Sequence, residues 1–480
     1  MQPPPGSHVH LIAVCGTAMG SLAAMLAERG CRVTGSDAHT YPPMSDFLRE
    51  AKVAVYEGFD AARLDPAPDL VVVGNAVSRG NPEVEATLDL RIPYTSLPEL
   101  LRDAFLVSKR PLVVTGTHGK TTTTAMAARL LDAGGLDPSF LIAGIPQDFP
   151  RPYRLGSGGC FVIEGDEYDS AFFAKFPKFF FYRPDLLIVN NIEYDHADLY
   201  ASLGEIERAF RHLLNTVPGN GLILANGDDP VTARLLPNAP APVQTFGMGS
   251  TCRWRAAEVA QGRGRQRFSM LDGERVFGRF EIRLSGEHNL RNALGAAAAA
   301  AHLGVPAAAI AEGLSSFTGI RRRQELLGEF GGVTVIDDFA HHPTAVEQTL
   351  HGLREAWVPA RLWAVFEPAS ATNARHVFED RYLRAFAGAD RVTLAAVPRP
   401  ERARGDAPFS PERLVAGLNR GGCQAGFAPS KEEILELLCA EAAEGDLVVF
   451  MSNGGFGGVQ RSFVDLLKQR AKESGKCPKV

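Results

Sequence analysis

The residues of this chain that could do the most chemistry form a glycine-rich segment, TGTHGKTTT, at positions 115–123. An apolar run typical of a strand precedes it at 111–114, and a helix-like run follows at 125–133. In a strand–turn–helix arrangement, backbone amides and the positive end of the helix can bind a polyphosphate. Lys120 could reach the β- and γ-phosphates, and the Thr121 hydroxyl could bind Mg²⁺. Because the segment lacks the longer Gly-x4-Gly-Lys spacing, its strand–turn–helix context carries the prediction of a nucleotide site, formed by Gly116, Thr117, His118, Gly119, Lys120 and Thr121.

Acidic residues and a histidine directly follow two further apolar runs. The run at 160–163 leads into Glu164, and the run at 186–189 leads into a polar segment that contains His196. The carboxyl ends of parallel strands meet at one edge of a sheet. The glycine-rich residues 116–121, which we call the phosphate loop, lie at the same edge. Since Mg²⁺ prefers oxygen ligands, we expect a metal site formed by Thr121, Glu164 and His196. For His196, a structural role as a hydrogen-bonded residue stays open, and the acids at 166–169 and 195 could be a solvated charge run.

Three motifs later in the chain could complete a nucleotide site. Asn289 and Asn292 lie three residues apart before an Ala-rich run, so on a helix they share one face and could bind an adenine edge. An ordinary helix N-terminus is the alternative. The run Arg321 to Arg323 offers guanidinium groups for a γ-phosphate. Residues 337–344 follow a strand-like run and offer acids for a ribose or a metal and imidazoles for phosphate, with Asp338 and His341 as the candidates.

The N-terminal segment indicates a second ligand site. A strand-like run at 8–14, a turn with two glycines and a helix-like run lead to a second strand-like run at 32–35. This pattern resembles a nucleotide-binding half of a doubly wound fold, although the third glycine of the dinucleotide motif is missing and a tight turn without a ligand is the alternative. Ligands of such sheets bind beyond the carboxyl ends of the strands. The predicted contacts are therefore Thr17, Ala18, Met19, Ser36, Asp37, Asn75 and Ser78.

The elements that must position these residues are alternating strands and helices along all 480 residues. Fully apolar runs predict strands of parallel sheets that are buried on both faces. We expect three α/β domains: a Rossmann-like domain at 1–107, a P-loop-type ATPase-like domain with a parallel sheet at 108–317, and a second Rossmann-like domain at 318–480.

Composition excludes several classes of protein. The chain is 45% hydrophobic and 22% charged, with a net charge of −5, so nucleic acid is not an expected partner. No apolar run approaches the ~18 residues that cross a bilayer, so no membrane partner is expected. The first residues have no signal-peptide pattern, and seven scattered cysteines argue against a disulfide framework or a zinc site. These features predict a cytoplasmic protein, of unknown oligomeric state.

Together, these motifs resemble the Mur ligase family, ATP-dependent enzymes that attach amino acids or peptides to UDP-N-acetylmuramic acid. The resemblance covers nearly the whole chain, in order: residues 16–20 with Ser36 and Asp37, then 116–123, 164–167, 191–198, 288–292, 321–323 and 337–344. It implies ATP and Mg²⁺ as cofactors. It also implies acyl activation, with Lys120, His118, Glu164 and His196 as catalytic residues and Arg323 completing the ATP site.

Further segments resemble one branch of the family, which joins UDP-N-acetylmuramate to the murein tripeptide L-alanyl-γ-D-glutamyl-meso-diaminopimelate in peptidoglycan recycling. They are residues 166–173, which include the aromatic run at 168–173, and residues 178–179, 182–184, 195–198, 366–368 and 451–458. The resemblance implies a peptide site on the third domain, with Arg375, Ser452 and Asn453 as candidates. The sister enzyme that adds L-alanine is the alternative, and a P-loop NTPase switch without ligase activity is a more distant one. One departure stands out: several relatives hold a second Mg²⁺ through a carbamylated lysine, but residues 179–430 contain no lysine.

Overall fold

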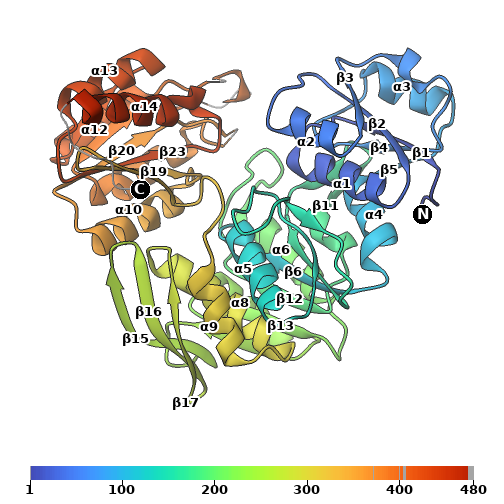
Figure 1. Ribbon diagram of the computed structural model, residues 1–480, viewed down its shortest axis with the longest axis horizontal. Coiled ribbons are helices and arrows are strands. Elements are labelled where there is room, and N and C mark those ends of the chain that lie inside the picture. Colours follow the sequence, from blue (N-terminus) through green and yellow to red (C-terminus); the bar gives the residue numbers. More distant parts are fainter. Residues whose placement is uncertain (1, 371, 399, 404–406, 474–480) are drawn as a thin grey trace.

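The computed structural model describes residues 2–370, 372–398, 400–403 and 407–473, which form three α/β domains. The N-terminal domain is blue in Figure 1, the central domain runs from cyan to yellow, and the C-terminal domain is orange to red. Each domain has its own sheet, in which parallel strands predominate. The predicted class is therefore confirmed, whereas the limits at 107/108 and 317/318 stay predictions.

The N-terminal sheet has five parallel strands in the order β3-β2-β1-β4-β5. Because β1 pairs with both β2 and β4, the strand order reverses there and leaves a crevice beyond the carboxyl ends, where ligands of such sheets bind. Helix α1 begins at Thr17, earlier than the helix-like run that starts at Ser21. The elements are β1 (His8–Ile12), α1 (Thr17–Glu28), β2 (Arg32–Asp37), α2 (Met44–Glu50), β3 (Ala54–Glu57), β4 (Leu70–Val73), α3 (Pro82–Asp89), β5 (Tyr94–Ser96) and α4 (Leu97–Leu101).

The central sheet has ten strands in the order β17-β16-β15-β14-β13-β12-β6-β9-β7-β8. Its parallel centre consists of the predicted apolar runs, namely β6 (Arg110–Thr115), β9 (Cys160–Gly165), β12 (Leu186–Val189) and β13 (Leu222–Asn226), joined by β7 (Ser139–Leu141) and β14 (Val243–Gly247). Helices α5 (Lys120–Ala133), α8 (Glu287–His302) and α9 (Ala307–Ser316) cover one face of the sheet, and α6 (Leu203–Leu214) and α7 (Pro230–Leu235) pack on the other face.

The sheet is not purely parallel, which corrects the expectation for this domain. Strands β15 (Trp254–Gly262), β16 (Arg265–Asp272) and β17 (Arg275–Ile282) form an antiparallel arm that extends from β14 (Figure 1). Strand β8 (Tyr153–Arg154) is antiparallel at the other edge. The arm escaped prediction because its strands mix buried and exposed positions and have no continuous apolar run.

The C-terminal sheet has six strands in the order β18-β19-β23-β20-β21-β22. All neighbours are parallel except β18 and β19, which form an antiparallel pair. The strands are β18 (Glu325–Phe330), β19 (Val333–Asp338), β20 (Arg361–Phe366), β21 (Arg391–Leu394), β22 (Gln424–Phe427) and β23 (Asp446–Met451). The helices are α10 (Pro343–Trp357), α11 (Glu379–Ala385), α12 (Pro411–Arg420), α13 (Lys431–Glu441) and α14 (Val459–Glu473).

The hydrophobic cores of the N-terminal and central domains are continuous. One cluster runs from β1 and α1 through Leu101 and Phe105 to the central sheet. In addition, the hairpin of β10 (Asp169–Ala171) and β11 (Ala174–Pro177) places Phe172 and Phe173 against the N-terminal cluster around Val73. The Phe173 ring meets Tyr94 edge-on, with 5.0 Å between ring centroids. The end of the aromatic run, Phe172 and Phe173, therefore docks the central domain on the N-terminal domain.

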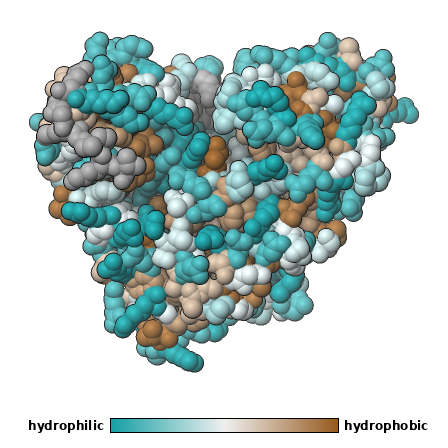
Figure 2. All heavy atoms as spheres, in the orientation of Figure 1, coloured by the Kyte–Doolittle hydropathy of each residue, from teal (hydrophilic) through white to brown (hydrophobic). Residues whose placement is uncertain are grey.

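The face of the molecule in Figure 2 is largely hydrophilic and is notched between the N-terminal and C-terminal domains. Among the described residues, no helix is both long and apolar enough to span a membrane. Six of the seven cysteines lie in the described residues and are all free thiols, whereas Cys477 lies outside them.

Candidate active site

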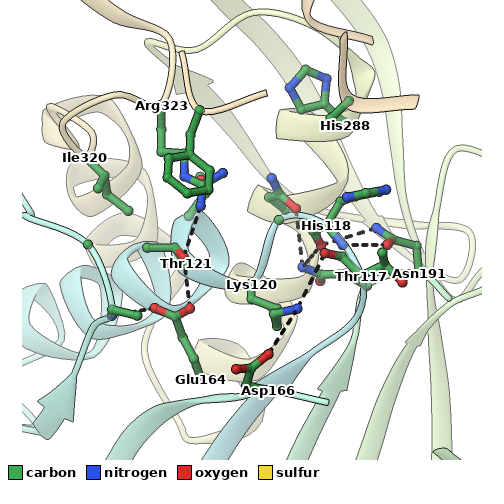
Figure 3. A pocket seen from close by; sticks show the side chains of 18 of the residues that line it. Thr117, His118, Lys120, Thr121, Glu164, Asp166, Asn191, His288, Ile320 and Arg323 are labelled. Carbon is green, nitrogen blue, oxygen red and sulfur yellow. Dashed lines mark hydrogen bonds and ion pairs between the residues drawn. The ribbon is translucent and has the colours of Figure 1, made fainter. Parts of the chain in front are cut away.

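A cavity of about 810 Å³ lies where the three domains meet. Residues of the phosphate loop, of the strand ends of the central sheet and of the C-terminal domain line it (Figure 3). Most predicted site residues are among them: Thr17, Ala18, Met19, Asn75, Thr117, His118, Gly119, Lys120, Thr121, Glu164, His196, Asn289, Asn292, Arg323, Asp338 and His341. Residues chosen from separate motifs of the sequence are thus brought to one space.

Two glycines give the phosphate loop its shape. Gly116 and Gly119 have φ values of +128° and +80°, in the region that favours glycine. A Cβ atom on Gly116 would lie 2.9 Å from the backbone of Asn191, and one on Gly119 would lie 2.3 Å from Asn292 Oδ1. The loop therefore packs tightly on β12 and α8, which leaves its amides at the start of α5.

Lys120 stands at the first position of α5 and is held inside the loop. Its Nζ donates to Gly116 O at 2.7 Å and to Glu167 Oε2 at 2.8 Å, and lies 3.9 Å from Asp166 Oδ1. Burial opposes the charge on Lys120, but the carboxylates of Glu167 and Asp166 outweigh it and raise the pKa of the ammonium. Lys120 therefore presents a permanent positive charge at the phosphate loop.

Thr121 and Glu164 form a second pair beside the loop (Figure 3). The Thr121 hydroxyl donates to Glu164 Oε2 at 2.9 Å, and the Ala143 amide donates to Glu164 Oε1 at 2.7 Å. Burial raises the pKa of the Glu164 carboxyl despite these hydrogen bonds. The pair is a set of hard oxygen atoms, suited to a small divalent cation.

His196 contacts a different carboxylate from the one expected. Its Nε2 lies 3.4 Å from Glu167 Oε1, and suitable atoms of Asp166, Glu167 and His196 lie within 4.8 Å of one another. In the described residues, no hydrogen bond or ion pair joins His196 to Glu164. Burial lowers the pKa of His196, but the hydrogen bond to Glu167 and the charge of Asp195 outweigh burial and raise the pKa to about 9. The role of His196 as a metal ligand stays a prediction.

His118 lies on the other side of the loop, facing the C-terminal domain. Its amide donates to Asn191 Oδ1 at 2.8 Å, and its ring lies 4.7 Å from the ring of His342. The buried Nε2 atom has no hydrogen-bond partner among the described residues. Burial, together with the neighbouring His342, holds the pKa of His118 well below its usual value. A neutral imidazole is therefore available at the cavity.

The predicted adenine and C-terminal groups also meet at the cavity. Asn292 Nδ2 donates to Asn289 Oδ1 at 3.3 Å on one face of α8, as their spacing predicted. Arg323 Nη2 lies 3.5 Å from Thr121 Oγ1 and brings a cation from the segment before β18. Asp338 accepts the amides of Gln324 and Ala340, and burial lowers the pKa of His341 to about 4.

Six predicted substrate contacts lie outside the lining of this cavity: Ser36, Asp37, Ser78, Arg375, Ser452 and Asn453. Ser36 is fully buried and donates to Glu83, so its side chain braces the N-terminal sheet. Asp37 accepts the Cys15 amide, which fixes the turn after β1, and Ser78 is exposed. Ser452 donates to Glu367 Oε2 at 2.6 Å, and Arg375 donates to Ala197 O at 3.4 Å. Asn453 differs, because its Oδ1 atom is buried with no partner in the described structure.

Sequence reasoning missed three residues that hold the site together. Asn190 Nδ2 donates to Thr123 Oγ1 at 3.0 Å, beneath the phosphate loop. Asp228 accepts from Arg291 Nε at 3.0 Å at the cavity wall. Glu193 accepts hydrogen bonds from Thr344 and Arg381 of the C-terminal domain. Asn190 directly follows β12, and Asp228 lies two residues after β13, so their position after an apolar run was the available signal.

Comparison with known families defines the class. The chain matches three family descriptions in succession: the Mur ligase family catalytic domain at residues 8–107, the Mur ligase middle domain at 114–300, and the Mur ligase glutamate ligase domain at 322–454. The chain therefore belongs to the Mur ligase family, whose members are ATP-dependent ligases that form a carbon–nitrogen bond.

Individual proteins that resemble the chain include two kinds of UDP-N-acetylmuramate ligase. The chain is 41% identical, over 97% of its length and 99% of the relative, to the UDP-N-acetylmuramate–L-alanyl-γ-D-glutamyl-meso-2,6-diaminoheptandioate ligase of Escherichia coli. It is 34% identical, over 93% of its length and 94% of the relative, to the UDP-N-acetylmuramate–L-alanine ligase of Chlorobium phaeobacteroides. Among solved structures, a murein peptide ligase from Psychrobacter arcticus has a TM-score of 0.72 at 36% identity, covering 96% of this chain and 99% of that one. The UDP-N-acetylmuramate–alanine ligase of Thermotoga maritima has a TM-score of 0.80 at 24% identity, covering 97% and 100%, and shows the shared fold alone.

Proposed function

We propose that this protein is a murein peptide ligase, which joins UDP-N-acetylmuramate to L-alanyl-γ-D-glutamyl-meso-diaminopimelate at the expense of ATP. The observation that carries the proposal is the 41% identity along 97% of the chain to a ligase of that name, compared with 34% for an L-alanine ligase. The site supports the same chemistry, since one cavity joins a phosphate loop, a partly buried lysine and a hydroxyl–carboxylate pair.

The proposed reaction begins with attack of the muramate carboxylate on the γ-phosphate of ATP. The resulting acyl phosphate is then attacked by the α-amine of the tripeptide, and phosphate leaves from a tetrahedral intermediate. Negative charge develops on phosphate oxygens in the first step. Lys120 stabilises that charge from the loop, and Arg323 adds a second cation from the C-terminal domain. Because His118 is neutral, its ring can donate a hydrogen bond to the reacting carboxylate, and it does not repel Lys120 or Arg323.

Mg²⁺ fits the pair of Thr121 and Glu164, because both offer oxygen atoms beside the phosphate loop. When bound, Mg²⁺ would neutralise charge on the β- and γ-phosphate oxygens. Thr121 must then turn its hydroxyl hydrogen away from Glu164, and Glu164 must be ionised. A cation would favour ionisation, since it offsets the burial that raises the Glu164 pKa. His196 would become a ligand of the metal only after its contact with Glu167 is broken.

The proposal is tested by comparing acceptors. Purified protein is incubated with UDP-N-acetylmuramate, ATP and Mg²⁺, and with either the tripeptide or L-alanine, while ADP release and the mass of the product are followed. We expect ADP release that requires both substrates, with kcat/KM for the tripeptide about 10⁴-fold above that for L-alanine, because a site with buried polar groups rejects a ligand that leaves them unpaired. Equal use of L-alanine would assign the chain to the alanine-adding enzymes, and ADP release without either substrate would indicate an NTPase.

A further inference from the structure

A segment of the central domain, residues 193–198 between β12 and α6, contacts the C-terminal domain through Glu193, Tyr194, Asp195 and Ala197. We call it the docking segment. The Tyr194 ring packs against the C-terminal core around Tyr382. Apart from the contacts of Glu193, three hydrogen bonds connect the described residues of the segment to the C-terminal domain: His342 Nε2 with Tyr194 O at 3.3 Å, Thr372 Oγ1 to Asp195 Oδ1 at 3.4 Å, and Arg375 Nη1 to Ala197 O at 3.4 Å.

Glu193 makes the charged contact of this segment. Its Oε2 atom accepts from Thr344 Oγ1 at 2.7 Å and from Arg381 Nη2 at 3.1 Å. Arg381 also donates to Thr344 Oγ1 at 2.9 Å, so the three groups form a closed triangle between the central domain, α10 and α11. The Glu193 side chain is only 24% exposed, which strengthens its contacts relative to a surface pair.

The same residue is attached to the phosphate loop on its other side. The Glu193 amide donates to Thr117 Oγ1 at 2.8 Å, and the Thr117 hydroxyl lies 3.3 Å from Glu193 O. The second carboxylate oxygen, Oε1, lies 3.7 Å from His118 Nε2. One residue thus touches two consecutive members of the phosphate loop and two helices of another domain.

A metal site at this place is disfavoured by the state of His342. Atoms of His118, Glu193 and His342 do lie within 4.8 Å of one another. However, His342 Nδ1 accepts the Thr344 amide at the start of α10, and its Nε2 is shared with Tyr194 O. An amide can only donate and a carbonyl can only accept, so both ring nitrogens of His342 are used. The cluster is a hydrogen-bonded junction.

We infer that Glu193 is a positioning residue, which couples docking of the C-terminal domain to the placement of Thr117 and His118 in the phosphate loop. Arg323 contributes to the cavity from the C-terminal domain, so its reach to Thr121 depends on how that domain docks. A carboxylate that binds Arg381 and Thr344 only in the docked arrangement favours that arrangement by its differential contacts. Glu193 need not touch substrate for this.

The test combines kinetics with a measurement of docking. Glu193→Gln keeps the size of the side chain and removes its charge, and Arg381→Gln removes the partner. Since hydrogen bonds to charged groups change equilibria by about tenfold or more, and Arg381 is partly exposed, we expect each variant to lower kcat about tenfold. The KM for ATP should change less than twofold. The double variant should be no slower than either single variant, because both remove one interaction.

Glu207→Gln is the matched control. Glu207 pairs with Arg234 Nη2 at 2.8 Å and is 20% exposed, but both residues belong to the central domain. This variant should keep the kcat and docking of the unaltered protein. Docking is measured as the distance distribution between spin labels at two exposed positions, Arg208 on α6 and Glu436 on α13. The distances are measured with a non-hydrolysable ATP analogue bound.

We expect Glu193→Gln and Arg381→Gln to broaden the interdomain distance distribution with the nucleotide analogue bound. A lower melting temperature with an unchanged distribution and unchanged kcat would overturn the inference and leave a merely structural ion pair. Additive losses in the double variant would also overturn it. The kinetic part rests on the proposed ligase function, whereas the distance measurement uses nucleotide alone. Failure of the unaltered protein to ligate any acceptor would therefore refute the proposed function separately.

Discussion

The ammonium of Lys120 lies 2.8 Å from Oε2 of Glu167, and this carboxylate also lies 3.4 Å from His196 through Oε1. Glu167 is only 2% exposed, so it joins the lysine of the phosphate loop to the histidine of the docking segment inside the protein. Binding of a polyphosphate would compete with Glu167 for Lys120. Lys120 and His196 together outweigh the burial of Glu167, so they lower the pKa of its carboxyl and keep it ionised.

Lys120→Ala should abolish ligation and also destabilise the protein. Loss of the charge that stabilises the transferred phosphoryl group should lower kcat/KM by about 10³-fold or more. Glu167 would then be buried with His196 as its remaining cation, at a cost of roughly 1–3 kcal/mol in the free energy of unfolding. Urea unfolding and ligation assays check both effects. Addition of Glu167→Gln should restore stability but not activity, and near-normal turnover of folded Lys120→Ala would remove Lys120 from the mechanism.

Glu164→Ala should raise the Mg²⁺ concentration that gives half-maximal activity by about tenfold or more, because it removes a charged oxygen ligand from the proposed metal site. The measurement is a Mg²⁺ titration at saturating ATP. Asp169→Asn serves as the control, since Asp169 is another buried acid near the site but pairs with Lys175. An identical titration for Glu164→Ala and the unaltered protein would exclude Glu164 from the metal shell.

The contribution of His196 to stability should depend on pH. Its pKa is about 9 in the folded protein and about 6.5 when unfolded, so folding favours the protonated form. Its stabilising effect is therefore complete below about pH 6.5 and is lost as the pH rises through 9. In metal-free protein, the difference in unfolding free energy between the unaltered protein and His196→Gln should fall by up to about 3 kcal/mol over this range. A difference that stays constant from pH 6 to 9.5 would contradict the ion pair with Glu167.

Asn453→Ala should weaken use of the tripeptide without affecting ATP. The Oδ1 atom of Asn453 is buried and without a partner in the described residues, so a donor such as the distal amine of diaminopimelate would satisfy it. We expect kcat/KM for the tripeptide to fall about 10- to 100-fold and the KM for ATP to stay constant. Ser452→Ala provides a comparison, because Ser452 already bonds Glu367. Unchanged tripeptide kinetics in Asn453→Ala would remove this residue from the peptide site.

The parallel strands and the residues at their carboxyl ends could be predicted, because a fully apolar run bounded by polar residues is a local signal. Glu164 near the carboxyl end of β9 and Asn75 after β4 were found in this way. Local patterns could not show which carboxylate His196 would face, since Glu164 and Glu167 are only three residues apart and the choice depends on the packing of the docking segment. Likewise, the burial of Ser36 depends on Glu83, which lies 47 residues away.

Contacts between domains were the least predictable part of the site. Glu193 and Arg381 are separated by 188 residues, and each would be an unremarkable surface charge on its own domain. No spacing rule connects them. Their pairing follows from the way in which α10 and α11 dock on the segment after β12, and that geometry emerges only in the assembled fold.

The aromatic hairpin has a practical consequence for dissecting the molecule. Phe172 and Phe173 belong to the central stretch of sequence, yet they cover apolar residues of the N-terminal sheet, and the core continues through Phe105 across the predicted limit at residue 107. A fragment that ends at that point would expose a hydrophobic surface to solvent, and such surfaces promote aggregation. The first two thirds of this chain should therefore be produced and studied as one piece, whereas the covalent connection near residue 318 is the better place to separate a fragment.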